Sequence, residues 1–369
     1  MDNPTLITGE EVFTKLLEAG PKPEKVTFVF GAGASYGYSR NSKAYVPPIV
    51  SELFSDENST VNEIIKKPEH LYILDGRDFI EKTLQKTYGG DLEEYLSSLY
   101  EGDDDDDYFA ALLIYLQDVC QLASVKMDKS NNNYKFLCEK FRALRGKRPW
   151  TCISFNYDTL FERSYIATGR NLERNFSHYS HYAEDYPKLL KMHGGINFRY
   201  IYKEVAVAQK RGRHIFNLMM KEKLVKGSSS VLQDARVAIP DFFTTSRMRD
   251  EEGIFREFAI YNFPLMMIPI HTTKKSENPF FEEMLLSAQQ EIEASSLVVS
   301  IGYNFGDKLF CEAIKNINTS NKELLIVDIK KSIQSFETGN KAKQIKEFWK
   351  GPVRIFDGNG FTDFIDAII

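Results

Sequence analysis

Short apolar runs separated by helical patterns constrain the fold of this chain more than any other feature. The runs span 26–30, 150–155, 189–193, 296–303 and 323–329. They show no regular polar alternation, which is typical of parallel strands that are covered on both faces. The sequence therefore predicts an α/β fold, a Rossmann-like parallel sheet with helices on both faces. In such sheets, ligands bind beyond the carboxyl ends of the strands.

The stretch between the first two runs is mostly helical in pattern. Apolar residues recur at helical spacing along 91–100 and along 109–123, so each of these segments would bury one face. We interpret 50–148 as a helical insertion within a single domain that covers 1–369. The polar, weakly patterned stretch 200–265 is interpreted as a second, irregular insertion.

Composition argues against several classes of function. With 47 basic and 52 acidic residues, the formal charge is −5, which disfavours direct binding of nucleic acid. The four cysteines have no paired spacing, so we expect reduced thiols and no metal site. No signal-peptide pattern opens the chain, and its most apolar stretch, 264–270, is too short to span a membrane. We therefore expect a soluble, cytoplasmic protein without a membrane partner.

The sequence GAGAS, residues 31–35, directly follows the first apolar run. Glycines at this place allow a tight turn and a close approach of the backbone to a phosphate. A tight turn without a ligand explains the motif equally well. The motif also departs from the dehydrogenase fingerprint, because the third glycine is missing and no helical pattern follows at once. A hydride-transfer enzyme is therefore a poor interpretation.

Two further runs end in polar groups. Asn156 and Asp158 close the second run, and their spacing places both side chains on the same side of an extended chain. They suit a ribose hydroxyl or a water, but Asn and Asp are also common in the turns that end strands. His193, followed by two glycines, closes the third run. A histidine can accept a proton near neutral pH, although a lone histidine is more often structural.

The last two runs also end in candidate polar groups. Gly302 and Asp307, in SIGYNFGD, lead into a helical pattern, whose start would attract a phosphate or take Asp307 as its cap. Asp328 would accept a ribose hydroxyl or cap the segment that follows. The aspartate-rich stretch 101–109 is interpreted as a solvated loop and helix cap, since consecutive aspartates cannot all converge on one ion.

Taken in order, GAGAS, SFNYDTLFE, KLLKMHGGINF and IGYNFGD resemble one family. They are similar to the sirtuin-like NAD-cleaving domains of bacterial antiphage defence systems, which are distant relatives of the sirtuin deacylases. The resemblance extends over residues 26–330, most of the chain. It implies that NAD is the substrate of this protein.

The resemblance also implies a role for each matching residue. Asn156 and Asp158 match the pair that binds the sugar and positions water, and His193 matches the catalytic base. Residues at the other strand ends would border the nucleotide: Gly31, Ala32, Gly33 and Ser35 at the phosphates and the nicotinamide ribose, and Gly302, Asp307 and Asp328 at the adenosine half. Because His193 must be neutral to act as a base, we expect activity to fall below about pH 6.5.

The expected activity is hydrolysis of NAD to nicotinamide and ADP-ribose, by an NAD-depleting antiphage effector. Sirtuin deacylases carry a zinc ribbon of paired cysteines, and this sequence has no such pairs. An NAD-dependent protein deacylase or ADP-ribosyl transferase stays open as an alternative, as does a non-enzymatic sensor of NAD or ADP-ribose. Because an NAD-depleting activity needs restraint, we also expect a homo-oligomer. By analogy with the family, we expect a protein partner in trans, such as a HerA-type ATPase.

Overall fold

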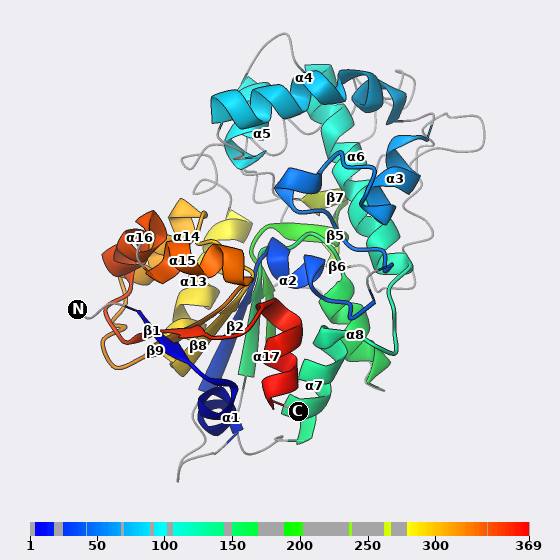
Figure 1. The fold of residues 1–369 in the computed structure, drawn as a ribbon. Helices are drawn as coiled ribbons and strands as arrows, with labels where there is room; N and C mark the ends of the chain where they lie inside the picture. The colour runs from blue at the N-terminus through cyan, green and yellow to red at the C-terminus, as the bar shows by residue number, and fades with distance from the viewer. Residues whose placement is uncertain are drawn as a thin grey trace.

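A computed structural model of the chain shows a central sheet between layers of helices (Figure 1). The structure describes residues 4–17, 25–41, 43–67, 70–88, 92–101, 106–143, 150–168, 188–201, 236–237, 262–266, 279–337 and 339–368. Most of 200–265, which we interpreted as an irregular insertion, lies outside these residues, as do positions 102–105 of the aspartate-rich stretch.

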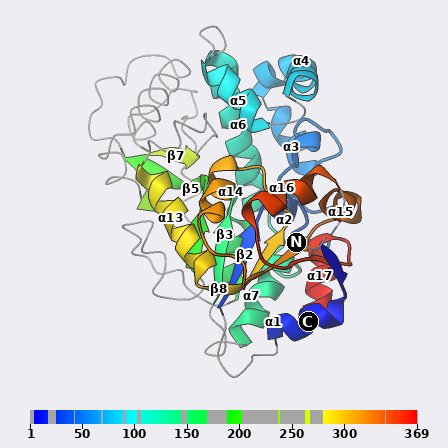
Figure 2. The same ribbon diagram turned by 90° about the vertical axis from the view of Figure 1, so that its left-hand side faces the viewer.

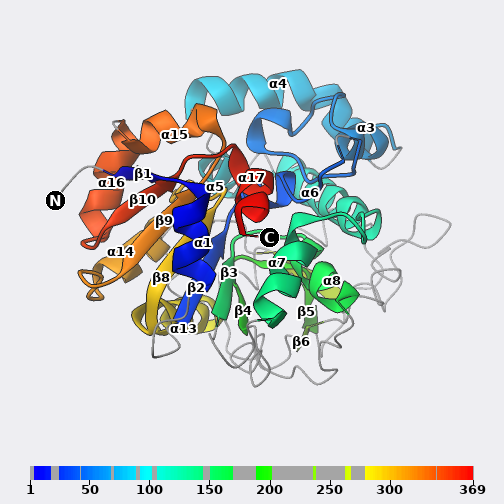
Figure 3. The ribbon, with the colours of Figure 1, turned by 60° about the horizontal axis from the view of Figure 1, so that its bottom comes forward.

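The central sheet has seven parallel strands in the order β1-β10-β9-β8-β2-β3-β4. Its members are β1 (Thr5–Ile7), β2 (Lys25–Phe30), β3 (Trp150–Ser154), β4 (Lys188–Lys191), β8 (Ser295–Ile301), β9 (Glu323–Val327) and β10 (Val353–Phe356). Figure 3 shows this order, from β1 and β10 at one edge to β3 and β4 at the other. The predicted fold class is confirmed. Strands β1 and β10 were not predicted, because three or four residues are too few to show a pattern.

Helices cover both faces of this sheet, as predicted (Figure 1). One layer contains α1 (Gly9–Leu17), α7 (Asn133–Ala143), α8 (Leu160–Ala167) and α17 (Gly360–Ile368). The other contains α13 (Pro279–Glu293), α14 (Lys308–Lys315), α15 (Lys330–Glu337) and α16 (Asn340–Phe348). In α14 the buried residues Ala313 and Ile314 follow the buried Phe310 by three and four positions, so the helix presents one apolar face to the core.

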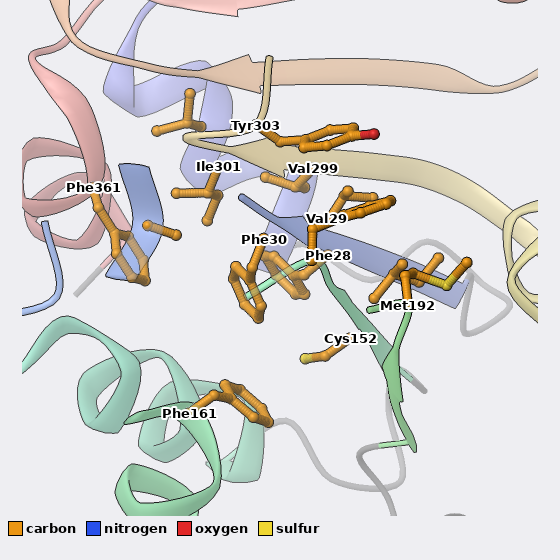
Figure 4. Packing of buried hydrophobic residues seen from close by; sticks show 14 of the residues in the cluster. Phe28, Val29, Phe30, Cys152, Phe161, Met192, Val299, Ile301, Tyr303 and Phe361 are labelled. Carbon is orange, nitrogen blue, oxygen red and sulfur yellow. The ribbon is translucent and has the colours of Figure 1, made fainter. Parts of the chain in front are cut away.

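Strand β2 lies in the middle of the sheet and is buried on both faces, as its apolar sequence predicts. Phe28 and Phe30 are two positions apart and therefore share a face. The ring of Phe30 lies 5.5 Å from that of Phe161 in α8 and 6.4 Å from that of Phe361 in α17 (Figure 4). Burial of each such side chain contributes roughly 1.5–3 kcal/mol. This packing anchors the carboxyl end of β2 against α8 and α17.

A helical segment lies over the carboxyl edge of the sheet in both side views (Figures 1 and 2). It consists of a 3-10 turn (Val50–Glu52), α3 (Ser59–Ile65), α4 (Leu71–Tyr88), α5 (Leu92–Glu101) and α6 (Asp106–Val125). Helices α5 and α6 contain the two amphipathic stretches that the sequence predicts. The insertion boundaries 50–148 and the single-domain assignment stay predictions.

A second, smaller sheet follows β4. It is antiparallel, in the order β6-β5-β7, and consists of β5 (Gly194–Ile201), β6 (Arg236–Val237) and β7 (Asn262–Met266). The strand predicted to end at residue 193 ends at Lys191, so Met192 and His193 form the turn between β4 and β5. None of the helices that the structure describes is both long and apolar enough to cross a membrane.

Candidate functional site

The carboxyl ends of β2 and β8 form the topological switch point of the central sheet. From β2 the chain continues to β3 and β4 on one side, and it later returns to β8, β9 and β10 on the other. Ligands of open α/β sheets usually bind where the connections diverge in this way. GAGAS follows β2 and GYNFGD follows β8, so two of the predicted motifs meet at this point.

The two motifs contact each other through their backbones. The Gly33 amide donates to the Gly302 carbonyl over 3.0 Å, and the Gly31 amide donates to the Ile301 carbonyl over 3.1 Å. Gly302 has a φ of +58°, and a Cβ built on it would lie 2.4 Å from the backbone nitrogen of Ala34. Glycine is required there because any side chain would clash with that backbone. A Cβ on Gly31 or Gly33 would likewise clash with Gly302 or Tyr303, so the glycines allow the two motifs to pack closely.

A short helix begins inside GAGAS. Helix α2 (Ala32–Tyr36) starts immediately after Gly31, and Gly37 follows its last residue. The sequence shows no helical pattern after the motif, and the structure has no helix directly after Tyr36; the five-residue helix begins within the motif and is too short to display its period in the sequence. The predicted contacts of Gly31, Ala32 and Gly33 with a nucleotide stay predictions.

The side chain of Asn156 is held by the GAGAS segment. Its Nδ2 donates to the Gly31 carbonyl over 2.9 Å and to the Ser35 hydroxyl over 2.8 Å. Both hydrogens of the amide are thereby used within the protein, which leaves Oδ1 as the atom able to accept from a substrate hydroxyl or a water. Asn156 is buried, with 9% of its surface exposed. Its orientation is therefore set before any ligand arrives.

Tyr134 of α7 extends this network below Ser35. Its hydroxyl lies 3.2 Å from the Ser35 hydroxyl, and both residues are buried. Burial raises the pKa of Tyr134 well above its ordinary value, so the phenol keeps its proton. Ser35 thus links Tyr134 to Asn156 and positions the Asn156 amide. The sequence reasoning missed Tyr134, because a tyrosine in an amphipathic helix carries no signal that distinguishes it from core.

His193 pairs with Asp307 across the switch point. Its Nε2 lies 2.8 Å from Asp307 Oδ2, and both side chains are buried. The ring also meets Phe155 edge-on at 5.2 Å and lies 6.0 Å from the ring of Tyr157, measured between centroids. Phe155 and Tyr157 are the two neighbours of Asn156 in the chain. The structure therefore brings His193 against the segment that carries Asn156, as the sequence predicts for strands whose ends adjoin.

Two aspartates of the predicted site accept backbone amides at the starts of helices. Asp307 Oδ1 accepts the Phe310 amide over 3.0 Å at the start of α14. Asp158 Oδ1 accepts the Leu160 amide over 3.0 Å at the start of α8. The alternatives that the sequence left open, a cap for Asp307 and a turn residue for Asp158, are thus observed. Asp307 has the additional bond to His193, so it lies beside the candidate base, whereas its predicted place was the adenosine half.

Asp328 lies at the end of β9, one strand further from the switch point. Its Oδ1 accepts the Ile329 amide over 2.7 Å. Burial raises the pKa of this carboxyl, and the bond from the Ile329 amide and the nearby Lys341 partly counteract the effect. Among the residues described here, no hydrogen bond joins Asp328 to Asn156, His193 or Asp307. Its predicted contact with a ribose stays a prediction.

Cys120, Cys138, Cys152 and Cys311 are buried free thiols. Burial raises the pKa of Cys311 to about 12, so this thiol stays protonated and unreactive. No group of three or more His, Cys, Asp or Glu side chains within the described ranges is arranged to hold a metal ion.

Comparison with known proteins gives no close relative. No family model matches the chain, and no curated protein matches it either. Among solved structures it is similar to a Sir2 homologue in complex with NAD, with 11% identity, coverage of 100% of this chain and 95% of that chain, and a TM-score of 0.40. It is also similar to a Sir2 enzyme from a study of mechanism and regulation, with 12% identity, coverage of 97% of this chain and 98% of that chain, and a TM-score of 0.38. For a Sir2 enzyme bound to a propionylated peptide, the identity is 11%, the coverage is 97% of this chain and 96% of that chain, and the TM-score is 0.37. At this level of similarity, neither the activity nor the ligands of those enzymes transfer to this chain.

Proposed function

We propose that the protein hydrolyses NAD to nicotinamide and ADP-ribose at the switch point of its sheet. The observation that carries the proposal is the buried His193–Asp307 pair, at 2.8 Å, packed against both neighbours of an amide whose orientation is already fixed. A base and a water-positioning group side by side at a ligand-binding sheet edge suit hydrolysis of a nucleotide. The order of the sequence motifs, which resembles that of NAD-cleaving domains, supports NAD as that nucleotide.

The proposed reaction breaks the bond between C1′ of the ribose and the nicotinamide nitrogen. The bonding electrons leave with nicotinamide, and the neutral ring needs no proton. A water oxygen bonds to C1′ as its proton passes to His193, which later returns it to solvent. The Oδ1 of Asn156 accepts from the attacking water or a ribose hydroxyl, because its Nδ2 is already occupied. In the neutral histidine, an Nε2–H that donates to Asp307 leaves Nδ1 as the basic nitrogen.

We also propose a biological role, which the sequence resemblance supports. In this role, the enzyme is an antiphage effector that depletes NAD and thereby stops both host and phage. Such an activity must be restrained until infection, so the proposal includes a homo-oligomer and a protein partner in trans, such as a HerA-type ATPase. Comparison of NAD levels in infected cells that carry the wild type or Asn156→Ala tests this role. Equal NAD levels in the two would contradict it.

The direct test measures nicotinamide release from NAD by the purified full-length chain and by Asn156→Ala and His193→Gln. Both substitutions should reduce release by roughly 100-fold or more, since each removes a group that acts on the water. The matched control is His70→Gln. His70 is another buried histidine paired with an aspartate, Asp118, at 3.0 Å, but it lies in the helical segment. Equal losses in His70→Gln and His193→Gln would contradict the assigned site.

A further inference from the structure

Lys191 is a buried charged residue close to the candidate site. It is the last residue of β4, two positions before His193, and only 1% of its side chain is exposed. An ammonium group buried without partners would be very costly, so such a residue persists where partners compensate it. The mechanism proposed above assigns Lys191 no role.

The ammonium group has two partners that belong to different elements. Nζ donates to the backbone carbonyl of Asp158, in the loop after β3. It also lies 3.1 Å from Glu162 Oε1, on α8, and 2% of that side chain is exposed. Burial raises the pKa of Glu162, and Lys191 counteracts that effect. Lys191 thus joins the end of β4 to the loop that carries Asn156 and to the helix that follows it.

We propose that Lys191 is a positioning residue that holds the Asn156–Asp158 loop in register with the His193 turn. Two backbone bonds run beside it, from the Met192 amide to the Ser154 carbonyl over 2.8 Å and from the Ile196 amide to the Tyr157 carbonyl over 2.9 Å. The first bond attaches the end of β3, and the second attaches the loop at Tyr157. The Lys191 bond adds a side-chain link to the same loop at Asp158. Its catalytic consequence rests on the proposed hydrolysis of NAD.

Two apolar substitutions, at Lys191 and Glu162, distinguish a positioning role of Lys191 from a purely stabilising one. Lys191→Met leaves the Glu162 carboxylate buried without its cation, so this variant should be less stable than the wild type. Combining it with Glu162→Leu removes both charges and should restore most of the thermal midpoint, because apolar pairs often replace buried ion pairs at no loss, and only the lost bond to the Asp158 carbonyl is not compensated. The bond to Asp158 is still absent in the double variant. We expect its kcat to stay about 10- to 100-fold below wild type, with little change in KM.

Two further variants keep this test decisive. Glu162→Gln retains the Lys191 bond to Asp158, so it should lose stability but keep a kcat near that of the wild type. Lys188→Met lies on the same strand at its other end, where Lys188 Nζ is 3.1 Å from Glu291 Oε1. It should also lose stability without loss of kcat. A double variant with wild-type kcat, or a Glu162→Gln kcat as low as that of Lys191→Met at equal folded fraction, would overturn the proposal.

Hydrogen exchange tests the same link without any substrate. In the double variant, amides of residues 155–160 should exchange faster than in the wild type, while those of β2 and β8 keep their protection. Unchanged exchange over 155–160 would overturn the positioning role. If the wild type releases no nicotinamide, the proposed function fails, but the exchange result still decides whether Lys191 holds the loop.

Discussion

At the scale of single residues, Gly302 is a position where both the backbone angle and the neighbouring backbone exclude a side chain. Its φ is +58°, and a Cβ would lie 2.4 Å from backbone atoms of Gly33 and Ala34. We expect Gly302→Ala to lower the free energy of unfolding by about 2–4 kcal/mol, since it adds strain and forces the two motifs apart. Urea denaturation measures the change.

Gly306 provides the control for this prediction, because it belongs to the same loop. A Cβ on Gly306 would meet the Asn304 side-chain oxygen at 2.9 Å, and that side chain can move aside. Gly306→Ala should therefore cost well under half of what Gly302→Ala costs. Equal losses in the two variants would show that the contact between the motifs does not limit stability.

Asp307 combines two roles that one substitution can separate. Its Oδ1 caps α14 and its Oδ2 bonds His193. Asparagine is an equally good cap, so Asp307→Asn should leave the thermal midpoint nearly unchanged. Its amide nitrogen can donate to His193 and favour the wrong tautomer, so nicotinamide release should fall roughly 10- to 100-fold. Wild-type release by a folded Asp307→Asn protein would argue against His193 as the base.

At the scale of elements, Glu291 ties α13 to the amino ends of three strands. Its carboxylate pairs with Lys25 of β2 and with Lys188 of β4, and it accepts the hydroxyl of Thr151 in β3. Burial alone would raise the pKa of Glu291, but the bonds from Lys25 and Thr151 outweigh it, so the pKa is lowered. The ionised form is therefore favoured in the folded state, and this preference stabilises the fold above the unfolded pKa.

The stabilisation by Glu291 should disappear in acid. Because the folded pKa is the lower one, the contribution is complete above about pH 5 and is lost as the pH falls through the folded value. Glu291→Gln should lower the free energy of unfolding by about 1–2 kcal/mol at pH 7, a modest loss because 11% of the carboxylate side chain stays exposed. The difference from wild type should shrink below pH 4 in urea titrations. A difference that does not vary with pH would contradict the ionic origin.

Strand ends were predictable from the sequence, whereas the contacts between them were not. Apolar runs such as 26–30 and 150–155 indicate buried parallel strands, and this also places the polar residues that follow at one edge of the sheet. No local sequence pattern determines the order of the strands, so the pairing of His193 with Asp307 could be seen only in the structure. Lys191 did leave a signal. It is a lone charge within an apolar run, and such a charge needs a buried partner.

At the scale of the whole molecule, the helical segment is connected to the candidate site through α6. The Thr159 amide, next to Asp158, donates to the Ser124 hydroxyl of α6 over 3.0 Å. The segment therefore contacts the loop that carries Asn156 at Thr159, the residue after the one whose carbonyl accepts from Lys191. A partner bound to this segment would have a short physical route to the site.

In the proposed hydrolysis of NAD, water accepts the ribosyl group that nicotinamide leaves. The measurement that tests it most directly is mass-spectrometric quantification of nicotinamide and free ADP-ribose released from NAD, without peptide and then with an acyl-lysine peptide. We predict equal amounts of the two products without peptide, and no change when peptide is added. Release that requires the peptide would indicate a deacylase or transferase, and binding of NAD with no release would indicate a sensor. Either result would contradict the proposed hydrolase.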